Sequence, residues 1–192
     1  MKKLVFTQLA QEESNWCWVA TGLSIAQYFG RGTELRQADF YLKAGGPLGN
    51  VPEPEPGTWN LTAGLQQVQV GWQELGLAPG TLAVGTVKEE SNGATAVAGI
   101  LDFDVIKEEI EAGRPILTRV GRAAGDHALV IYGYDAETDG GTVHFSDPWA
   151  RSSFATDSPP RDTYQSMPYS AYVENMEFRW LQSAYRIGQE PG

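Results

Sequence analysis

The stretch QEESNWCWVA, Gln11 to Ala20, contains the only cysteine of the 192-residue chain. Cys17 lies between two tryptophans, at the start of an apolar repeat that predicts a helix from about Trp16 to Phe29. We expect Ser14 or Asn15 to cap the beginning of this helix. The sequence therefore predicts a cysteine in the first turn of a helix.

A cysteine acts as a nucleophile only as its thiolate, and a free thiol has a pKa of about 8.5. The positive end of a helix and a nearby imidazolium both lower that pKa. The predicted position of Cys17 meets the first condition, and a histidine from elsewhere must meet the second. On its own, a cysteine at a helix start is more often a small buried hydrophobe. A catalytic role for Cys17 therefore depends on a histidine close to it.

The chain has two histidines, and each lies in a predicted strand. His127 opens the apolar run HALVIYGYD, residues 127–135, which predicts a buried central strand. His144 lies within GTVHFSDP, residues 141–148, and we expect it on the sheet face that His127 does not occupy. Asp126 alternates to the other face from His127, so it is a weak candidate to orient that ring.

The connection between these two strands decides which carboxylate reaches His127. A wide loop at about Asp135–Asp139 places His127 opposite Asp147, and cross-strand partners have Cβ atoms about 4.5–5.5 Å apart. A tight turn at Asp139-Gly140 places His127 opposite Ser152 instead. A Cys17–His127–Asp147 triad therefore predicts the wide loop.

Further residues near the cysteine suit the same chemistry. Attack on an amide carbonyl creates an oxyanion, and the side-chain amide of Gln11 with the backbone N–H of Cys17 would stabilise it. Trp16, Trp18 and Trp149 are candidates for substrate binding, although Trp16 and Trp18 equally suit the core or the wall of a cleft.

Three short blocks resemble the papain-like cysteine peptidases: Gln-x5-Cys-Trp, His-Ala-x4-Gly-Tyr, and an Asp followed shortly by Trp. The residues that match are Gln11, Cys17, Trp18, His127, Ala128, Gly133, Tyr134, Asp147 and Trp149. The motifs are most similar to the compact bacterial branch, which includes secreted effector peptidases and the leader-cleaving peptidases of peptide exporters. The chain departs from the plant enzymes at Trp16, where they carry a small residue, and at Asp147, where they carry Asn.

The resemblance implies an α+β, papain-like fold of one domain, in which a helical lobe and a twisted antiparallel sheet flank a cleft. We place the mainly helical lobe at about residues 1–78 and the mainly β lobe at about 79–192. Gly30 is expected to end the cysteine helix. Further helices are expected at 34–44, 61–76 and 101–113, strands at 4–10, 81–87, 114–120, 169–176 and 180–188, and a loop at 45–60.

Composition excludes several other classes. The formal net charge of −10 argues against nucleic-acid and anionic-membrane surfaces, and no apolar run approaches the roughly 18–20 residues of a membrane-spanning helix. One cysteine excludes an internal disulfide, and one cysteine with two histidines supplies a zinc site poorly. DAETDGG, residues 135–141, resembles a calcium loop, but Ser146 stands where the bidentate Glu is required.

The function expected from these residues is that of a papain-like cysteine endopeptidase, which acts on a peptide or protein through a thioester acyl-enzyme. We expect no metal or organic cofactor and a monomeric protein. Alternatives are acyl transfer or deamidation by the same triad, or a non-catalytic peptide-binding module. The N-terminal apolar segment is too short for a secretory signal, which leaves a cytoplasmic location or non-classical export open. The acidic balance, with Glu12 and Glu13 near the cysteine, weakly favours basic substrates.

Overall fold

The computed structural model describes residues 1–45, 64–84, 87–89, 95–97, 99–153, 155 and 162–188. Most of the loop expected at 45–60 lies outside this part of the chain. The first three residues of the helix expected at 61–76 and residues 85–86 of the strand expected at 81–87 also lie outside it.

Helices and antiparallel strands both contribute to the fold. The described helices are α1 (Cys17–Tyr28), α2 (Gln37–Lys43), α3 (Leu65–Glu74), α4 (Phe103–Glu111) and α5 (Tyr169–Val173). The described strands are β1 (Lys2–Lys3), β2 (Thr81–Val84), β3 (Val87–Glu89), β4 (Thr95–Val97), β5 (Ile116–Arg122), β6 (Gly125–Asp135), β7 (Thr142–Ser146), β8 (Tyr164–Pro168) and β9 (Phe178–Tyr185). Strands β2-β9-β5-β6-β7-β8 form one antiparallel sheet in that order, β1 adds to β6, and β3 pairs with β4 separately. The architecture is α+β.

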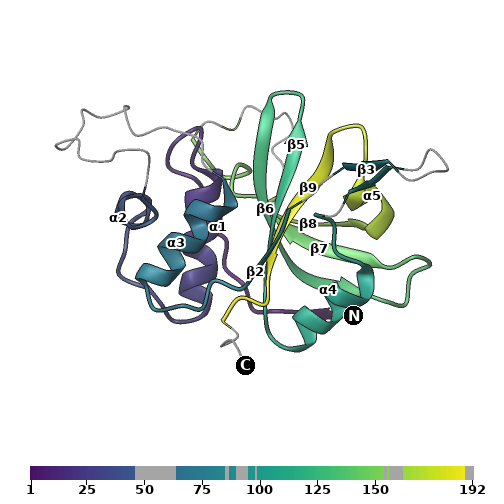
Figure 1. Cartoon of the computed structure of the whole chain (residues 1–192), viewed down its shortest axis with the longest axis horizontal. Helices are drawn as coiled ribbons and strands as arrows, with labels where there is room; N and C mark the ends of the chain where they lie inside the picture. The colour runs from purple at the N-terminus through teal and green to yellow at the C-terminus, as the bar shows by residue number, and fades with distance from the viewer. Residues whose placement is uncertain are drawn as a thin grey trace.

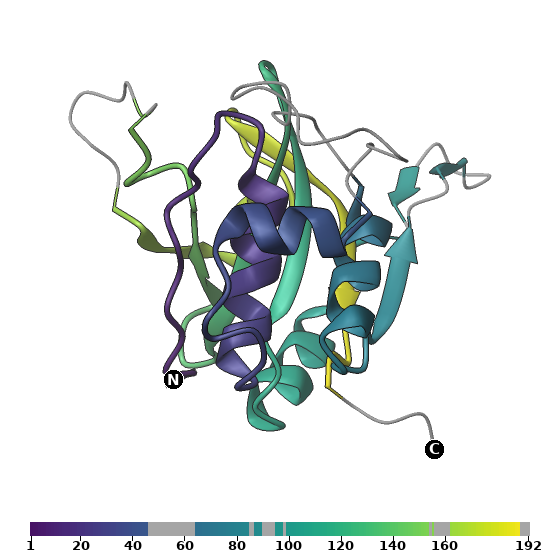
Figure 2. The same cartoon turned by 90° about the vertical axis from the view of Figure 1, so that its left-hand side faces the viewer.

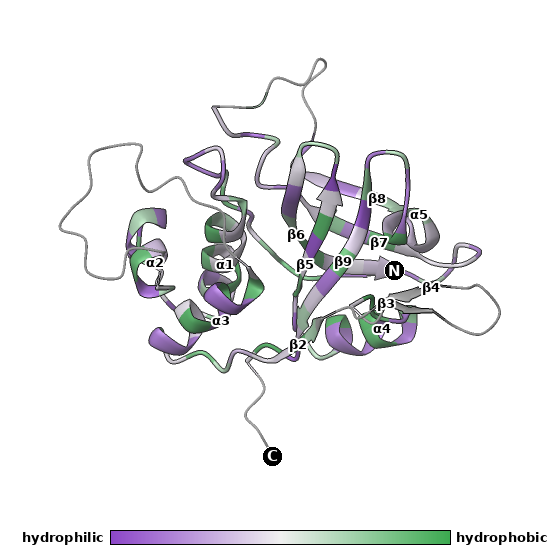
Figure 3. Cartoon of the chain, turned by 45° about the horizontal axis from the view of Figure 1, so that its top comes forward, coloured by the Kyte–Doolittle hydropathy of each residue, from purple (hydrophilic) through white to green (hydrophobic). Residues whose placement is uncertain are grey.

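The sheet separates two apolar cores. Helices α1, α2 and α3 lie on one side of it (Figure 1), where Leu23 and Trp72 pack with Val130 of β6. Helices α4 and α5 cover the other side, where Ile110 and Tyr172 belong to the second core. Figure 3 shows α4 with hydrophobic (green) and hydrophilic (purple) parts, as expected for a helix that covers one face of a sheet. Each face of the sheet is therefore covered by its own apolar core.

Helix α1 is fixed closely against its neighbours. It lies between α2 and the sheet (Figure 2). The indole Nε1–H of Trp72 donates to the carbonyl of Gly22 at 2.8 Å, inside the helical lobe. A Cβ atom at Gly22 would lie 2.7 Å from Val68 Cγ1 and 2.8 Å from Phe40 Cε1, so only glycine fits there without displacement. This close crossing determines where the first turn of α1 meets the sheet.

The ends of α1 follow the sequence only in part. Gly30 adopts a φ of +71° just beyond the end of the helix, so it ends the helix as expected. At the other end the prediction was wrong, because Trp16 occupies the N-cap position and no side chain caps the helix. The loop before α1 is held by the side chain of Gln11, whose hydrogen bonds are described below.

The register of the β6–β7 hairpin also differs from the prediction. The loop is wide, as expected, but it covers residues 136–141 and Tyr134 pairs with Val143 instead of Gly140. A bulge between Ile131 and Gly133 then shifts the pairing by one residue, back towards the predicted register. His127 lies beyond the paired part of β7, and Asp147 is the first residue after that strand.

Two strand predictions were wrong. The N-terminal strand is β1 at Lys2–Lys3 and not residues 4–10, because the chain leaves the sheet after Leu4 donates to the Tyr132 carbonyl. The segment expected as a strand at 169–176 begins with helix α5. Its aromatic residues suggested a strand, but Tyr172 is fully buried against the rings of three other aromatic residues of the second core, which a helical turn permits.

The close crossing at Gly22 gives a stability prediction. We expect Gly22→Val to lower the free energy of unfolding by about 1–3 kcal/mol, because the added atoms must displace Phe40 or Val68. Chemical denaturation measures the change. Gln27→Val places the same side chain at a half-buried position of α1 and should lower the free energy of unfolding clearly less. Equal losses in the two variants would contradict the packing argument.

Candidate active site

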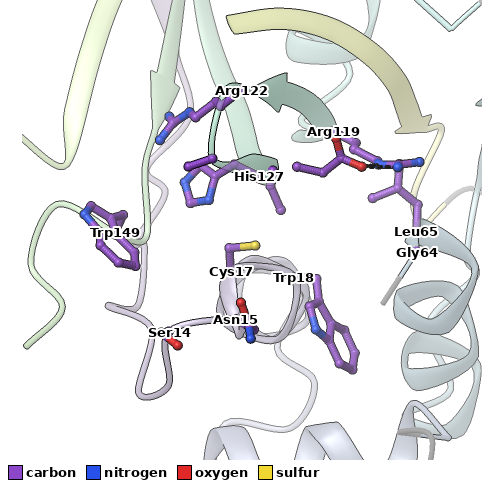
Figure 4. A pocket seen from close by; sticks show the side chains of 14 residues that line it. Ser14, Asn15, Cys17, Trp18, Gly64, Leu65, Arg119, Arg122, His127 and Trp149 are labelled. Atoms are coloured by element: carbon purple, nitrogen blue, oxygen red, sulfur yellow. Dashed lines mark hydrogen bonds and ion pairs between the residues drawn. The ribbon is translucent and has the colours of Figure 1, made fainter. Parts of the chain in front are cut away.

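Cys17 is the first residue of α1 and faces a cavity of about 690 Å³ between the helical lobe and the sheet. In Figure 4 its sulfur lies below the imidazole of His127, with Trp149 to one side and Trp18 and Leu65 to the other. The cavity lining comprises Ser14, Asn15, Cys17, Trp18, Gly64, Leu65, Arg119, Arg122, Ala124, Gly125, Asp126, His127, Ala128 and Trp149. The sulfur is thus half-buried and open to a molecule in the cavity.

The surroundings of Cys17 favour its thiolate. Burial raises the pKa of the Cys17 thiol, but four other contributions together lower it by more. They are the charge of His127 with its hydrogen bond, and the backbone N–H groups of Ala128 and Trp18. The resulting pKa lies below that of a free thiol. This agrees with the expectation that a nearby histidine activates the cysteine.

His127 connects the sulfur to a carboxylate. Its Nε2 lies 2.7 Å from Oδ1 of Asp147, which leaves Nδ1 as the nitrogen for Cys17. Burial lowers the pKa of His127, but the Cys17 charge and the hydrogen bonds that the ring donates to Asp147 and Cys17 raise it to about 9. The protonated ring is therefore favoured, as an ion pair with a Cys17 thiolate requires.

Asp147 is almost fully buried, and donors surround its carboxylate. Oδ1 accepts the His127 bond and the Trp149 backbone N–H at 2.8 Å, and Oδ2 accepts from Nη2 of Arg122 at 3.1 Å. Burial raises the pKa of Asp147, but His127, Arg122 and the Trp149 N–H hold that pKa well below its ordinary value. The carboxylate thus stays charged, as a partner of an imidazolium requires.

Arg122 was missed by the sequence reasoning. It ends β5 and pairs with Gly125 of β6, across a turn of two residues. Alternation along the hairpin could have placed it on the face of His127, two residues beyond Val120, which opposes His127. Only a correct β6–β7 register would have shown that Asp147 reaches the same place.

Gln11 lies beside the triad but does not line the cavity. Its backbone N–H donates to the Pro148 carbonyl at 3.0 Å, next to Asp147. Its side-chain amide donates to the carbonyls of Glu13 at 2.8 Å and Ser14 at 2.9 Å. Both amide hydrogens are thus engaged in holding the loop before α1, and neither points at the sulfur.

Comparison of the sequence with known protein families agrees with this geometry. A family model described as the Peptidase_C39 like family matches residues 3–180 of the chain. The chain belongs to this family. No curated protein matches it. The predicted membership of the papain-like cysteine peptidases and the predicted α+β papain-like fold are confirmed, and the family supports a cysteine peptidase-type function for this member.

The remaining predicted residues of this family member lie at different depths. Trp18 and Trp149 line the cavity, whereas Trp16 is buried and stacks on Tyr41, outside the lining. His144 lies on the sheet face opposite to His127, as expected, and is buried away from the cavity. Asp126 forms an ion pair with Arg119 of β5 on the other face from His127.

Metal binding and membrane insertion are two other properties that the described residues bear on. Among them, no three His, Cys, Asp or Glu side chains gather as a set that could hold a metal ion. Within the same described ranges, none of the helices combines the length and the apolar character needed to cross a bilayer.

The two bonds of the Gln11 amide predict that this residue stabilises the fold. We expect Gln11→Ala to lower the free energy of unfolding by about 1–3 kcal/mol, because two partly buried carbonyls lose their donor. Urea denaturation provides the measurement. Gln73→Ala, at an exposed position of α3, is the matched control and should change stability little. A loss as small as in this control would refute the role of Gln11 in the loop.

Proposed function

We propose that the protein hydrolyses peptide bonds with Cys17 as nucleophile, His127 as acid and base, and Asp147 as the group that orients the ring. The observation that carries this proposal is the position of the Cys17 sulfur next to the His127 imidazole (Figure 4), which is itself hydrogen-bonded to a buried carboxylate. The sulfur faces a cavity large enough for a peptide segment. The two half-reactions described next follow from a Cys17 thiolate and a protonated His127.

The first half-reaction begins with attack of the Cys17 thiolate on the carbonyl carbon of the substrate. A carbon–sulfur bond forms, and the carbonyl oxygen becomes an oxyanion. Nδ1–H of His127 then protonates the leaving nitrogen, the carbon–nitrogen bond breaks, and the amine departs. An acyl group remains on the sulfur as a thioester.

The second half-reaction returns the enzyme to its starting state. His127, now neutral, accepts a proton at Nδ1 from a water molecule, and the hydroxide attacks the thioester carbonyl. The carbon–sulfur bond breaks and the carboxylic acid leaves. The thiolate and the imidazolium are restored together, so these steps need neither metal nor organic cofactor.

Stabilisation of the oxyanion is assigned to the start of α1. The backbone N–H groups of the first turn of a helix have no acceptor within the helix, and the helix dipole favours negative charge there. The N–H of Cys17 is the proposed donor. Gln11 is proposed as the second donor, and this role requires one of its amide hydrogens to leave the carbonyl of Glu13 or Ser14 when substrate binds.

Substrate is proposed to lie along the cavity, across Cys17 and His127. Trp149 would contact the residues on one side of the scissile bond, and Trp18 with Leu65 those on the other, since these side chains flank the sulfur (Figure 4). The buried Trp16 would then support the cleft from behind through its stacking on Tyr41.

The nucleophile can be tested directly, because Cys17 is the only cysteine. We expect Cys17→Ala to abolish turnover of a peptide library and to leave the circular dichroism spectrum and the melting temperature nearly unchanged. Undiminished cleavage by this variant would end the proposal. Mass spectrometry of the products separates hydrolysis, which adds water to the fragments, from ligation to an amine and from deamidation. A non-catalytic peptide-binding module would instead turn over no substrate and would alkylate no faster than a model thiol.

The dependence on pH follows from the raised pKa of His127. Because the ion pair needs the protonated ring, kcat/KM should fall as the pH rises through about 9. Asp147→Asn removes a charge that raises the pKa of His127, so the alkaline limb should move to lower pH. Initial rates on a fluorogenic peptide across the pH range measure the alkaline limb of the wild type and that of the Asp147→Asn variant. Asp126→Asn is the control, and a larger shift in that variant than in Asp147→Asn would favour Asp126 as the orienting group.

A further inference from the structure

Arg122 lies at the tip of the β5–β6 hairpin and reaches back to the triad. It is two residues beyond Val120, which opposes His127, so Arg122 and His127 share one face of the sheet. The turn is short because Gly125 adopts a φ of +116°. The hairpin therefore delivers a guanidinium and an imidazole to the same buried carboxylate.

The two oxygens of Asp147 are satisfied by different groups. Oδ1 accepts from His127 and from the Trp149 N–H, whereas the recorded donor to Oδ2 within the described residues is Nη2 of Arg122. The side chain of Asp147 is only 2% exposed, so an oxygen without a donor would be costly. Arg122 thus satisfies the half of the carboxylate that His127 leaves open.

The Arg122 guanidinium has few other hydrogen-bond partners among the described residues. Nε of Arg122 is buried and has no partner among the described residues, so the side chain is not placed there for its own hydrogen bonds. The charged or titratable groups that face Asp147 in this part of the chain are His127, Arg122 and, from α5, Tyr172. Burial raises the pKa of the Tyr172 phenol, so that group stays neutral.

We propose that Arg122 is a positioning residue, which fixes the carboxylate of Asp147 so that Oδ1 faces His127 and the ring faces Cys17. This inference rests on the proposed function, since the positioned group serves the Cys17–His127 ion pair. Arg122 acts through Asp147 and not by contact with the substrate. An arginine held only at one oxygen leaves the other oxygen for the imidazole, which a bidentate pair would not.

A direct charge effect of Arg122 would have the same sign, so the proposal is tested by changing Asp147 as well. If Arg122 acted only as a nearby positive charge, its removal would raise the pKa of Cys17 whether or not Asp147 is present. If it holds Asp147, its removal weakens the support of the imidazolium and raises the pKa of Cys17 only while Asp147 is in place. The persistence of the shift in an Asp147→Asn background therefore distinguishes the two effects.

The experiment measures the rate at which iodoacetamide alkylates Cys17, as a function of pH, in the full chain. Because the chain has one cysteine, the signal is unambiguous. We expect Arg122→Met to move the acidic limb of this rate to higher pH and to lower the rate at mildly acidic pH several-fold. Arg122→Lys, which restores a cation near Oδ2, should remain close to wild type. Arg179→Met, on β9 opposite Gly121 and outside the cavity lining, is the matched control.

The decisive comparison is the effect of Arg122→Met in a protein that also carries Asp147→Asn. In that background Arg122→Met should have no further effect on the acidic limb, because the residue through which it acts is already changed. Peptide turnover gives a second readout, in which Arg122→Met should lower kcat with little change in KM. Should Arg122→Met fail to fold, the Arg122→Lys and Arg122→Gln variants give the same comparison, with Lys close to wild type and Gln shifted.

Three results would overturn the inference: an unmoved limb in Arg122→Met, a shift to lower pH, or an undiminished effect in the Asp147→Asn background. Each of them presupposes a wild-type Cys17 that alkylates faster than a model thiol, and leaves the proposed function standing. A wild-type Cys17 that reacts no faster than a model thiol would instead overturn the proposed function together with this inference.

Discussion

A charged carboxylate buried at the end of a strand needs hydrogen-bond donors on every side, and the arrangement of the site follows from how Asp147 obtains them. His127 comes from β6, Arg122 from the end of β5, and the Trp149 N–H from the turn that follows β7. The backbone of Asp147 donates to the Thr163 carbonyl, just before β8. Four segments are therefore joined at one residue through its side chain and its backbone, and the imidazole is held in place by these contacts.

The helical lobe must then bring a sulfur to the other side of the ring. Helix α1 is fixed by its close crossing at Gly22 and by the loop that Gln11 closes, and both determine where the first turn points. Because Gln11 also bonds to Pro148, the loop before the cysteine and the loop after the aspartate are tied together. The Cys17–His127 contact is thus placed by two lobes that are linked close to the reacting atoms.

The sequence predicted those parts of the site that depend on local patterns. The cysteine at the helix start, the strand that carries His127 and the Asp-Pro-Trp block are each encoded within a few residues. The β6–β7 register was not predictable in the same way, because the bulge between Ile131 and Gly133 leaves no local signal in an apolar run. Arg122 and the bonds of Gln11 depend on tertiary contacts, and the short helix α5 was hidden by aromatic residues that suit a strand equally well.

The charged groups at the cavity are paired with one another. With the ion pair formed, the thiolate of Cys17 faces the His127 imidazolium, and Asp147 faces Arg122, so these four charges cancel. Arg119 and Asp126 form a further neutral pair on the cavity wall. Glu12 and Glu13 do not belong to the described lining, and exposed charges are screened over about 8 Å at physiological ionic strength. The chain's charge of −10 is therefore carried by residues outside the described lining of this cavity, and the expectation of basic substrates stays a prediction.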